Sequence, residues 1–134
     1  MANSTTILSL RPHSGTGAQE LTGEKYRGSG YYGSTNRLYS LQVNIENFVG
    51  QVKLQASLES SPGVNDWFDV PFNQEYDYSM DTTGLVTRFQ RTSLNFAAAT
   101  TGVFGYNFAG NYVWLRAKID NWTAGTVNSI ILMN

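Results

Sequence analysis

Strict alternation of apolar and polar residues is the feature of this chain that most limits its possible folds. In LYSLQVNIE, which begins at Leu38, every second residue from Tyr39 to Ile45 is apolar and the residues between them are polar. The same pattern returns in VKLQASLE, from Val52 to Leu58. A period of two places alternate side chains on opposite faces of an extended strand, whereas a helix needs a period near 3.6. Both segments are therefore predicted to be strands with one buried face.

The sequence between these two strands predicts a hairpin, and further strands follow. The intervening NFVGQ contains Asn and Gly, which favour tight reversals. Strands are also predicted in DWFDVPF, VFGYNF, NYVWLRAKID and TVNSIILM. Their expected inward residues are Phe68, Val70, Phe72, Phe104, Tyr106, Phe108, Val113, Leu115, Ala117 and Ile119. NYVWLRAKID carries apolar side chains on both faces near its start, so it is predicted to be a central strand with Trp114 in the core.

The predicted fold class is all-β, an antiparallel sandwich of two sheets. No helices are expected to cover a single sheet, so the apolar faces of about seven short strands are best buried between two packed sheets. We expect an immunoglobulin-like sandwich over residues 38–134, with a jelly roll as the alternative. A Gly- and Tyr-rich N-terminal arm and loop is expected over residues 1–37. NIENFVGQV and KIDNWTAGTV resemble each other, which indicates either two hairpins with the same turn chemistry or an ancient duplication.

Length, charge and cysteine content exclude several classes of function. The 134 residues suffice for one domain with its own core. The chain has no cysteine, which removes thiolate catalysis and cysteine-ligated zinc. Nine basic and ten acidic residues give a net charge of −1, so neither nucleic acid nor a membrane surface is expected as a partner. No membrane-spanning run or secretion signal is evident, and synthesis in a cytoplasm is expected.

The stretch RGSGYYGSTN, which begins at Arg27, has glycines at the spacing of a dinucleotide-binding loop. Such a loop needs a strand before it and a helix after it, and the flanking sequence predicts neither. We interpret the glycines instead as a flexible arm that presents Tyr26, Tyr31 and Tyr32 to a neighbouring subunit. The alternative is that these tyrosines cover a sheet edge of their own chain.

Two further aromatic residues are predicted to contact a partner. Phe48 and Trp122 lie in the two similar segments, at what are expected to be hairpin tips. Packing is thin at such tips, so both rings are candidates for an assembly contact, or for stacking on a glycan in the case of Trp122.

No catalytic residue, metal site or cofactor is predicted. His13, the only histidine, follows Pro12 in an expected solvated loop. Acidic residues are concentrated between Asp66 and Asp81, namely Asp66, Asp69, Glu75, Asp77 and Asp81, with Arg88 and Arg91 nearby. Their spacing does not fit the familiar calcium loop, although an irregular calcium site or a glycosidase pair of carboxylates remains open. We expect this acidic loop to be solvated or to face an assembly partner.

Two long segments of the chain contain several motifs in a fixed order. They are GSGYYGSTNRLYSLQVNIENFVGQVKLQASLESSPGVNDWFDV and, later, YNFAGNYVWLRAKIDNWTAGTVNSI. Together these motifs resemble small virion structural proteins of tailed bacteriophages, of the marine cyanophage type. Residues 73–102 depart from the resemblance and residues 1–27 lie outside it. The resemblance implies a component of the virion, without deciding between head, neck and tail.

The expected function is therefore non-enzymatic. We expect an accessory or decoration subunit that binds an assembled capsid or tail lattice, with other virion proteins as partners and a homo-oligomeric or lattice-bound state. The alternative is a receptor- or polysaccharide-binding module of the tail tip. A calcium-dependent hydrolase is a more remote possibility.

Overall fold

The computed structural model describes residues 4–33, 38–72 and 76–133. The elements are β1 (Ser4–Leu8), β2 (Arg11–Pro12), β3 (Gln19–Thr22), β4 (Tyr26–Arg27), η1 (Ser29–Tyr32), β5 (Leu38–Ser57), β6 (Phe68–Asp69), β7 (Tyr76–Met80), β8 (Val86–Gln90), β9 (Leu94–Ala109) and β10 (Trp114–Met133). All are strands except η1, a single turn of 3-10 helix. The prediction of an all-β, antiparallel protein is confirmed, with one large sheet and a separate small sheet formed by β7 and β8.

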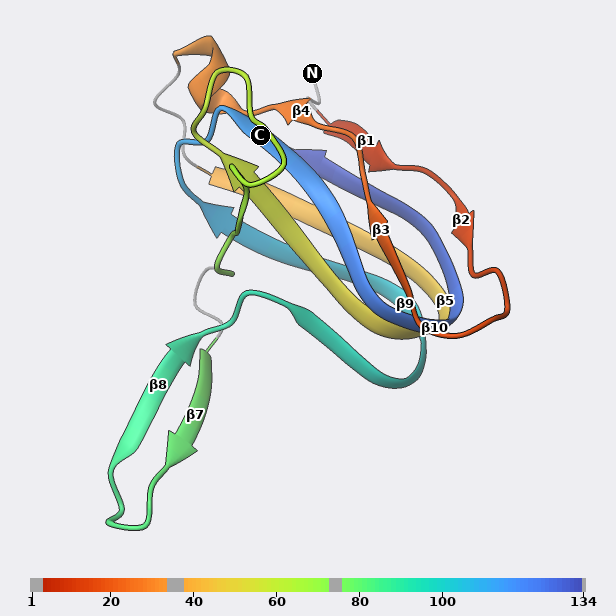
Figure 1. The fold of residues 1–134 in the computed structure, drawn as a ribbon, viewed down its shortest axis with the longest axis vertical. Coiled ribbons are helices and arrows are strands. Elements are labelled where there is room, and N and C mark those ends of the chain that lie inside the picture. Colours follow the sequence, from red (N-terminus) through yellow and green to blue (C-terminus); the bar gives the residue numbers. More distant parts are fainter. Residues whose placement is uncertain (1–3, 34–37, 73–75, 134) are drawn as a thin grey trace.

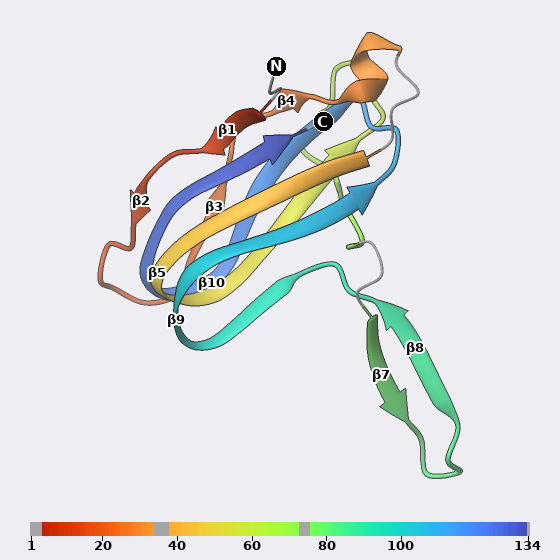
Figure 2. The same cartoon turned by 180° about the vertical axis from the view of Figure 1, so that it is seen from behind.

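The fold is organised by β5 and β10, which pair antiparallel along almost their whole length. Their register runs from Trp114 opposite Ser57 to Met133 opposite Ser40. Both strands bend sharply near the middle, so the pair folds over itself and contributes to two layers (Figures 1 and 2). Layer A contains residues 38–46 of β5, 126–133 of β10 and 102–109 of β9, with β1 and β2. Layer B contains residues 49–57 of β5, 114–120 of β10 and 94–96 of β9, with β3, β4 and β6.

The two bends lie beside each other and have matching chemistry. Asn47 in β5 and Asn121 in β10 both adopt left-handed backbone conformations, with φ of 51° and 49°. Asparagine tolerates this region better than most residues. Gly125 lies so close to the Asn47 carbonyl that a β-carbon would clash with it, and a β-carbon on Gly50 would lie 3.0 Å from the Trp122 Cα. Each bend thus packs against the other through a glycine.

The predicted hairpin between the first two strand segments is wrong. The two halves of β5 pair with β10 and β9, so NFVGQ is a corner between layers and not a reversal within one sheet. Alternation cannot distinguish these cases, because both arrangements give each half one inward face. The similarity of NIENFVGQV and KIDNWTAGTV reflects the paired corners of two bent strands.

Burial at the corner also overturns the expected exposure of its aromatic residues. Phe48 and Trp122 are buried, and their ring centroids are 6.2 Å apart. Each ring is covered by the opposite strand of the bent pair. Neither ring is therefore available on the surface of this structure.

Most predicted inward residues form one core between the layers. Fully or nearly fully buried are Tyr39, Leu41, Val43, Ile45, Val52, Leu54, Ala56, Val70, Phe72, Phe108, Leu115, Ala117 and Ile119. Leu58 and Phe68 are exposed instead: Leu58 follows the end of β5 at Ser57, and Phe68 is the first residue of the two-residue strand β6. Val113 is half-buried, immediately before β10 begins.

The described residues of the N-terminal segment lie along the edge of β10. β1 and β2 pair with its second half, and β3 and β4 with its first half. The segment turns between β2 and β3, beside the β10 bend (Figure 1). It hydrogen-bonds a strand edge that would otherwise be open, which agrees with the alternative that this segment covers an edge of its own chain.

The β7–β8 hairpin projects away from the two layers (Figures 1 and 2). Its strands pair with each other in their own small sheet. At its base, the Phe72 N–H donates to the Arg91 carbonyl at 2.7 Å and the Gln90 side-chain amide donates to the Phe72 carbonyl at 2.9 Å. Because Phe72 is buried, these bonds attach the base of the hairpin to the core.

We predict that Gly125→Ala destabilises the protein by at least about 2 kcal/mol, since the methyl group meets the Asn47 carbonyl at a positive φ. Urea unfolding measures this change. Gly105→Ala is the matched control, because a β-carbon there meets nothing within 4 Å, and its stability should change by no more than about 0.5 kcal/mol. Equal stability of the two variants would contradict the role given to the corner.

We predict that Leu54→Ala or Leu115→Ala lowers stability by about 2–5 kcal/mol, through lost burial and an unfilled cavity. Both side chains are fully buried between the layers. Leu58→Ala, at an exposed position, is the control and should leave the melting temperature nearly unchanged. A melting temperature unaffected by Leu54→Ala would contradict the assigned strand faces.

Candidate functional site

The structure brings three of the predicted assembly residues to one end of the sandwich. Tyr26, in β4, is partly buried against the core, whereas Tyr31 and Tyr32, in η1, are exposed. Phe48 and Trp122 lie at the bends, at the opposite end (Figures 1 and 2). The candidate site is therefore built around η1.

Close backbone contacts to its own chain hold η1 in place. The Gly28 N–H donates to the Val113 carbonyl and the Gly30 N–H donates to the Tyr112 carbonyl, each at 2.8 Å. A β-carbon on Gly30 would lie only 2.8 Å from the Tyr112 oxygen, and one on Gly28 would come closer still. The glycine spacing thus permits η1 to approach the end of β10. These glycines therefore make a contact within the chain, whereas the sequence predicted that they serve a contact with a neighbouring subunit.

A buried hydrogen-bond network fixes η1 from beneath. The Ser29 N–H donates to the Tyr39 hydroxyl oxygen at 2.9 Å, and the Ser29 and Tyr39 hydroxyl oxygens are 2.5 Å apart. Because the tyrosine oxygen accepts from the backbone, its proton can be donated to Ser29 Oγ. Ser29 Oγ in turn donates to Asn111 Oδ1 at 3.4 Å. Ser29 and Tyr39 are both buried, so breaking this network leaves polar groups unsatisfied.

Tyr112 forms an apolar support beside this network. Burial raises the pKa of its hydroxyl, with a smaller electrostatic contribution from Tyr39. The neutral hydroxyl donates to the Ala109 carbonyl at 3.0 Å. Its ring lies 5.9 Å from Tyr39 and 5.8 Å from Phe68. Tyrosine is neutral near pH 7 even at its ordinary pKa, so the upward shift of the Tyr112 pKa leaves its role as an uncharged packing residue unchanged.

The exposed part of the site combines aromatic rings with positive charges. We call Lys25, Arg27, Tyr31, Tyr32 and Trp114 the aromatic–cationic cluster. The Tyr31 ring centroid lies 5.2 Å from that of Tyr32 and 5.2 Å from that of Trp114, both in edge-to-face geometry. Lys25 Nζ lies 4.4 Å from the centre of the Trp114 ring, and the Arg27 guanidinium lies 4.5 Å from that of Tyr31. Cation–π contacts of this kind hold both cations against the rings.

The structure corrects the prediction that Trp114 lies in the core. It is half-buried on the outer face of layer B, and its indole N–H donates to the Ser60 carbonyl at 3.1 Å. The apolar bulk on this face of β10 is covered by Tyr31 and not by another sheet. The sequence of the strand alone could not show that Tyr31 covers Trp114, because η1 reaches Trp114 only through tertiary contacts.

The cluster borders a shallow recess of about 400 Å³. Its lining residues are Thr5, Lys25, Tyr26, Arg27, Tyr32, Trp114 and Leu132. It offers cations, hydrogen-bond donors and aromatic surface, which are the components of a binding site.

The acidic residues of segment 66–81 are dispersed, and its three fully described carboxylates each accept local hydrogen bonds. Asp66 accepts from the Gly63 N–H at 2.7 Å, and Asp69 accepts from the Gln55 amide at 3.0 Å. Asp81 accepts from the Thr83 hydroxyl, the Thr83 N–H and the Leu85 N–H in the β7–β8 turn. The Thr83 hydroxyl contributes most to lowering the pKa of Asp81, followed by these backbone donors.

Glu75 and the side chain of Asp77 lie outside the described residues. Among the His, Asp and Glu side chains that are described, no three are close enough together to hold a metal ion.

His13 holds the loop of residues 13–17 beside the β10 bend. Its Nδ1 accepts from the Gly15 N–H at 2.9 Å, its Nε2 lies 2.9 Å from the Gly17 carbonyl, and its ring is 5.3 Å from Trp122. The expected solvated histidine is thus half-buried in this structure.

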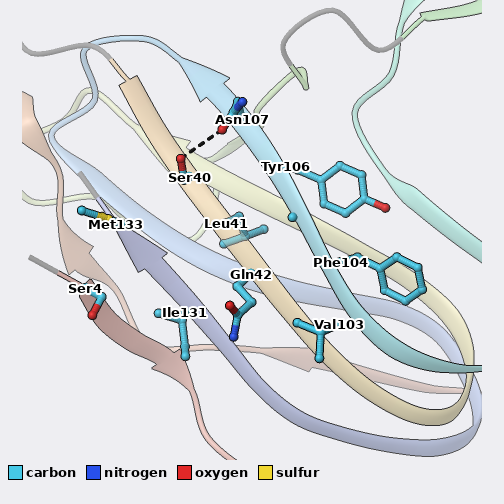
Figure 3. Close-up of a pocket in the computed structure, with 11 residues that line it drawn as sticks. Ser4, Ser40, Leu41, Gln42, Val103, Phe104, Tyr106, Asn107, Ile131 and Met133 are labelled. Atoms are coloured by element: carbon cyan, nitrogen blue, oxygen red, sulfur yellow. Dashed lines mark hydrogen bonds between the residues drawn. The ribbon is translucent and has the colours of Figure 1, made fainter. Parts of the chain in front are cut away.

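A second surface, which the sequence did not indicate, lies on the outer face of layer A. We call it the neutral groove, an open depression of about 760 Å³ between β1, β10, β5 and β9 (Figure 3). Gln42, Val103, Ile131 and Met133 lie along it, and no residue that lines it is charged. Alternation placed Gln42 on the polar face of its strand, but it did not show which strands lie beside that face, so the shared lack of charge became visible only once the strands were paired.

Comparison with known proteins gives no matching family model and no matching curated protein. Among solved structures, the chain is similar to SPBc2 prophage-derived protein YomS, with a TM-score of 0.51 and 11% sequence identity. The match covers 99% of this chain and 92% of that chain. The two proteins therefore share an overall fold.

A membrane-spanning helix is not found in the part of the chain that the structure describes.

We predict that Ser29→Ala destabilises the protein by about 1–3 kcal/mol, because it leaves the proton of the buried Tyr39 hydroxyl without an acceptor, while the backbone N–H at position 29 still donates to the hydroxyl oxygen. Denaturant unfolding measures the loss, and near-ultraviolet circular dichroism should report a changed environment of the η1 aromatic rings. Ser61→Ala, at an exposed position, is the control. An unchanged stability and aromatic spectrum would show that the network does not fix η1.

Proposed function

We propose that the protein is a non-enzymatic structural protein of a phage particle, an accessory or decoration subunit that binds an assembled capsid or tail lattice. The proposal takes the virion role from the sequence resemblance, and the fold shared with a prophage-derived protein supports a phage origin. The lattice contact rests on one observation, the exposure of Tyr31 and Tyr32 on a firmly anchored turn beside Trp114 and Arg27. The subunit would be made in the host cytoplasm and reside in the virion.

The composition of the aromatic–cationic cluster supports an interface. Tyr, Trp and Arg are the residues that most often dominate binding energy at protein interfaces. The sandwich suits this role, especially in the immunoglobulin-like form expected from the sequence, because its loops can vary while the layers hold them in place.

The two exposed tyrosines can contribute several kcal/mol to a lattice contact. Tyr31 is 43% exposed and Tyr32 is 66% exposed. If a tyrosine presents about 200 Å², burying the remaining area removes roughly 220 Å² from water, an upper limit of about 5 kcal/mol. Because η1 is already held by Gly28, Gly30 and Ser29, little ordering entropy opposes this gain. In a repeated lattice, this contribution recurs at every site.

A second candidate is a receptor- or polysaccharide-binding module of the tail tip. The observation that favours it is the recess itself, where Trp114 and Tyr32 lie beside Lys25 and Arg27. Aromatic rings can stack on sugar rings, and the two cations match an acidic polysaccharide.

We predict that Tyr31→Ser/Tyr32→Ser sharply reduces incorporation into particles. The double variant should cost the isolated domain about 1–3 kcal/mol, because Tyr31 also packs against Trp114, whereas Tyr32→Ser alone should cost less than about 1 kcal/mol. Quantitative immunoblotting of purified particles measures incorporation per folded molecule. Tyr32→Ser alone should give an intermediate loss, since this ring is the more exposed. Val64→Ser, at a highly exposed position elsewhere, is the control. Normal incorporation of the double variant would contradict the lattice contact, and binding of acidic glycans that the double variant loses would favour the second candidate.

A further inference from the structure

The β7–β8 hairpin carries three large apolar side chains and one cation on one face of a ribbon that projects away from the two layers. The register pairs Tyr78 with Arg88 and Met80 with Val86, and it places these residues on one face of the ribbon. The side chains of Tyr78, Met80 and Val86 are 67%, 70% and 55% exposed. Leu85, in the turn, is 64% exposed. A concentration of large exposed apolar side chains on so small an element marks an interaction surface.

Hydrogen bonds hold the hairpin in shape at both ends. The Asp81 carboxylate organises the turn by accepting from Thr83 and Leu85. At the base, the backbone of the buried Phe72 accepts a hydrogen bond from the Gln90 side-chain amide and donates one to the Arg91 carbonyl. A hairpin that is preorganised in this way loses little entropy on binding. Its five-residue strands extend about 17 Å, far enough to reach a neighbouring molecule.

The neutral groove is the surface of this chain whose chemistry matches the hairpin. Val103 is 59% exposed, and Ile131 and Met133 contribute apolar surface next to the amide of Gln42 (Figure 3). Gly105 lies in the groove, and nothing lies within 4 Å of the position its β-carbon would occupy. The groove therefore offers an open strip of uncharged surface.

The outer face of layer B is chemically opposite. There Lys53 Nζ lies 2.9 Å from Asp120 and 3.7 Å from Asp69, and Lys118 pairs with Glu20. The hydrogen bond from Lys53 to Asp120 is the main cause of the raised pKa of Lys53. Covering these ion pairs with an apolar ribbon would remove charges from water without new partners. The charge distribution thus favours the neutral groove as the acceptor.

We propose that the β7–β8 hairpin of one copy docks into the neutral groove of a second copy. The exposed parts of Tyr78, Met80, Leu85 and Val86 amount to roughly 400 Å², so a single contact buries on the order of 1,000 Å² in total. This buried area is near the lower limit for a specific interface. Each copy takes part in two such contacts when it both donates its hairpin and accepts another. Donor and acceptor are different surfaces, so copies either exchange hairpins in a reciprocal two-fold pair or join head to tail in a ring or an open filament.

This self-association goes beyond the proposed lattice contact and uses different residues. The aromatic–cationic cluster contains none of the residues of the hairpin or the neutral groove. Self-association and particle incorporation can therefore fail separately, and each has its own measurement.

We predict that Met80→Asp and Val103→Asp each weaken self-association at least tenfold, whereas a mixture of the two restores a 1:1 complex. The Met80→Asp chain keeps an intact groove and the Val103→Asp chain keeps an intact hairpin, so one contact can still form between them. Sedimentation velocity of the full chains at micromolar concentration measures the species. Val64→Asp is the matched control for an added charge at an exposed apolar position and should associate like the original chain.

The proposal is overturned if the original chain is monomeric at these concentrations, if either variant associates normally, or if the mixture stays monomeric. Circular dichroism and melting temperature establish that each variant is folded. If Met80→Asp removes particle incorporation but leaves self-association intact, the hairpin binds another virion protein, and the proposal is equally wrong.

Disulfide trapping gives a second measurement, because the chain contains no cysteine. A mixture of Met80→Cys and Val103→Cys chains should form an intermolecular disulfide under mild oxidation, much faster than the control mixture of Val64→Cys and Val103→Cys. Equal rates in the two mixtures would overturn the proposed contact.

Discussion

The whole architecture depends on the close contact between two bent strands. At this corner, Gly125 lies against the Asn47 carbonyl, and Gly50 packs against the backbone of Trp122. Because β5 and β10 bend at the same level, each half of one strand keeps the other as its hydrogen-bonded neighbour. The sheet therefore folds over without losing its ladder, and the inward faces of both halves form one core. A side chain in place of either glycine would push the two bends apart.

The corner also gives the two ends of the sandwich different properties. At the bend, Phe48 and Trp122 are buried by the opposite strand, which closes this end. At the other end, β10 begins and η1 packs over it, with Tyr31 and Tyr32 exposed (Figure 1). Rigid aromatic residues are thus concentrated at the end where close backbone contacts of glycine and a buried network already fix the chain.

The two outer faces differ in the same way. Layer B carries ion pairs and a cation–π contact between Arg116 and Trp67, while the neutral groove of layer A is lined by uncharged residues only. Together with the projecting hairpin, this gives the chain distinct surfaces for distinct contacts. The proposed lattice contact uses the aromatic–cationic cluster, and the proposed contact between copies uses the hairpin and the groove. Such a division suits a subunit that must bind both its own kind and a different protein.

The sequence by itself determined the class of the fold and most of its core. Period-two alternation identified the buried faces of β5 and β10, because the face of a side chain is a local property of an extended strand. Which strands pair with each other, in contrast, is not a local property of the sequence. Alternation could not show that the halves of β5 lie in different layers, nor that Gly28 and Gly30 approach Tyr112 of their own chain. Only the tertiary structure decided that Phe48 is buried, Tyr32 exposed and the neutral groove continuous, since each depends on strands brought together from distant parts of the chain.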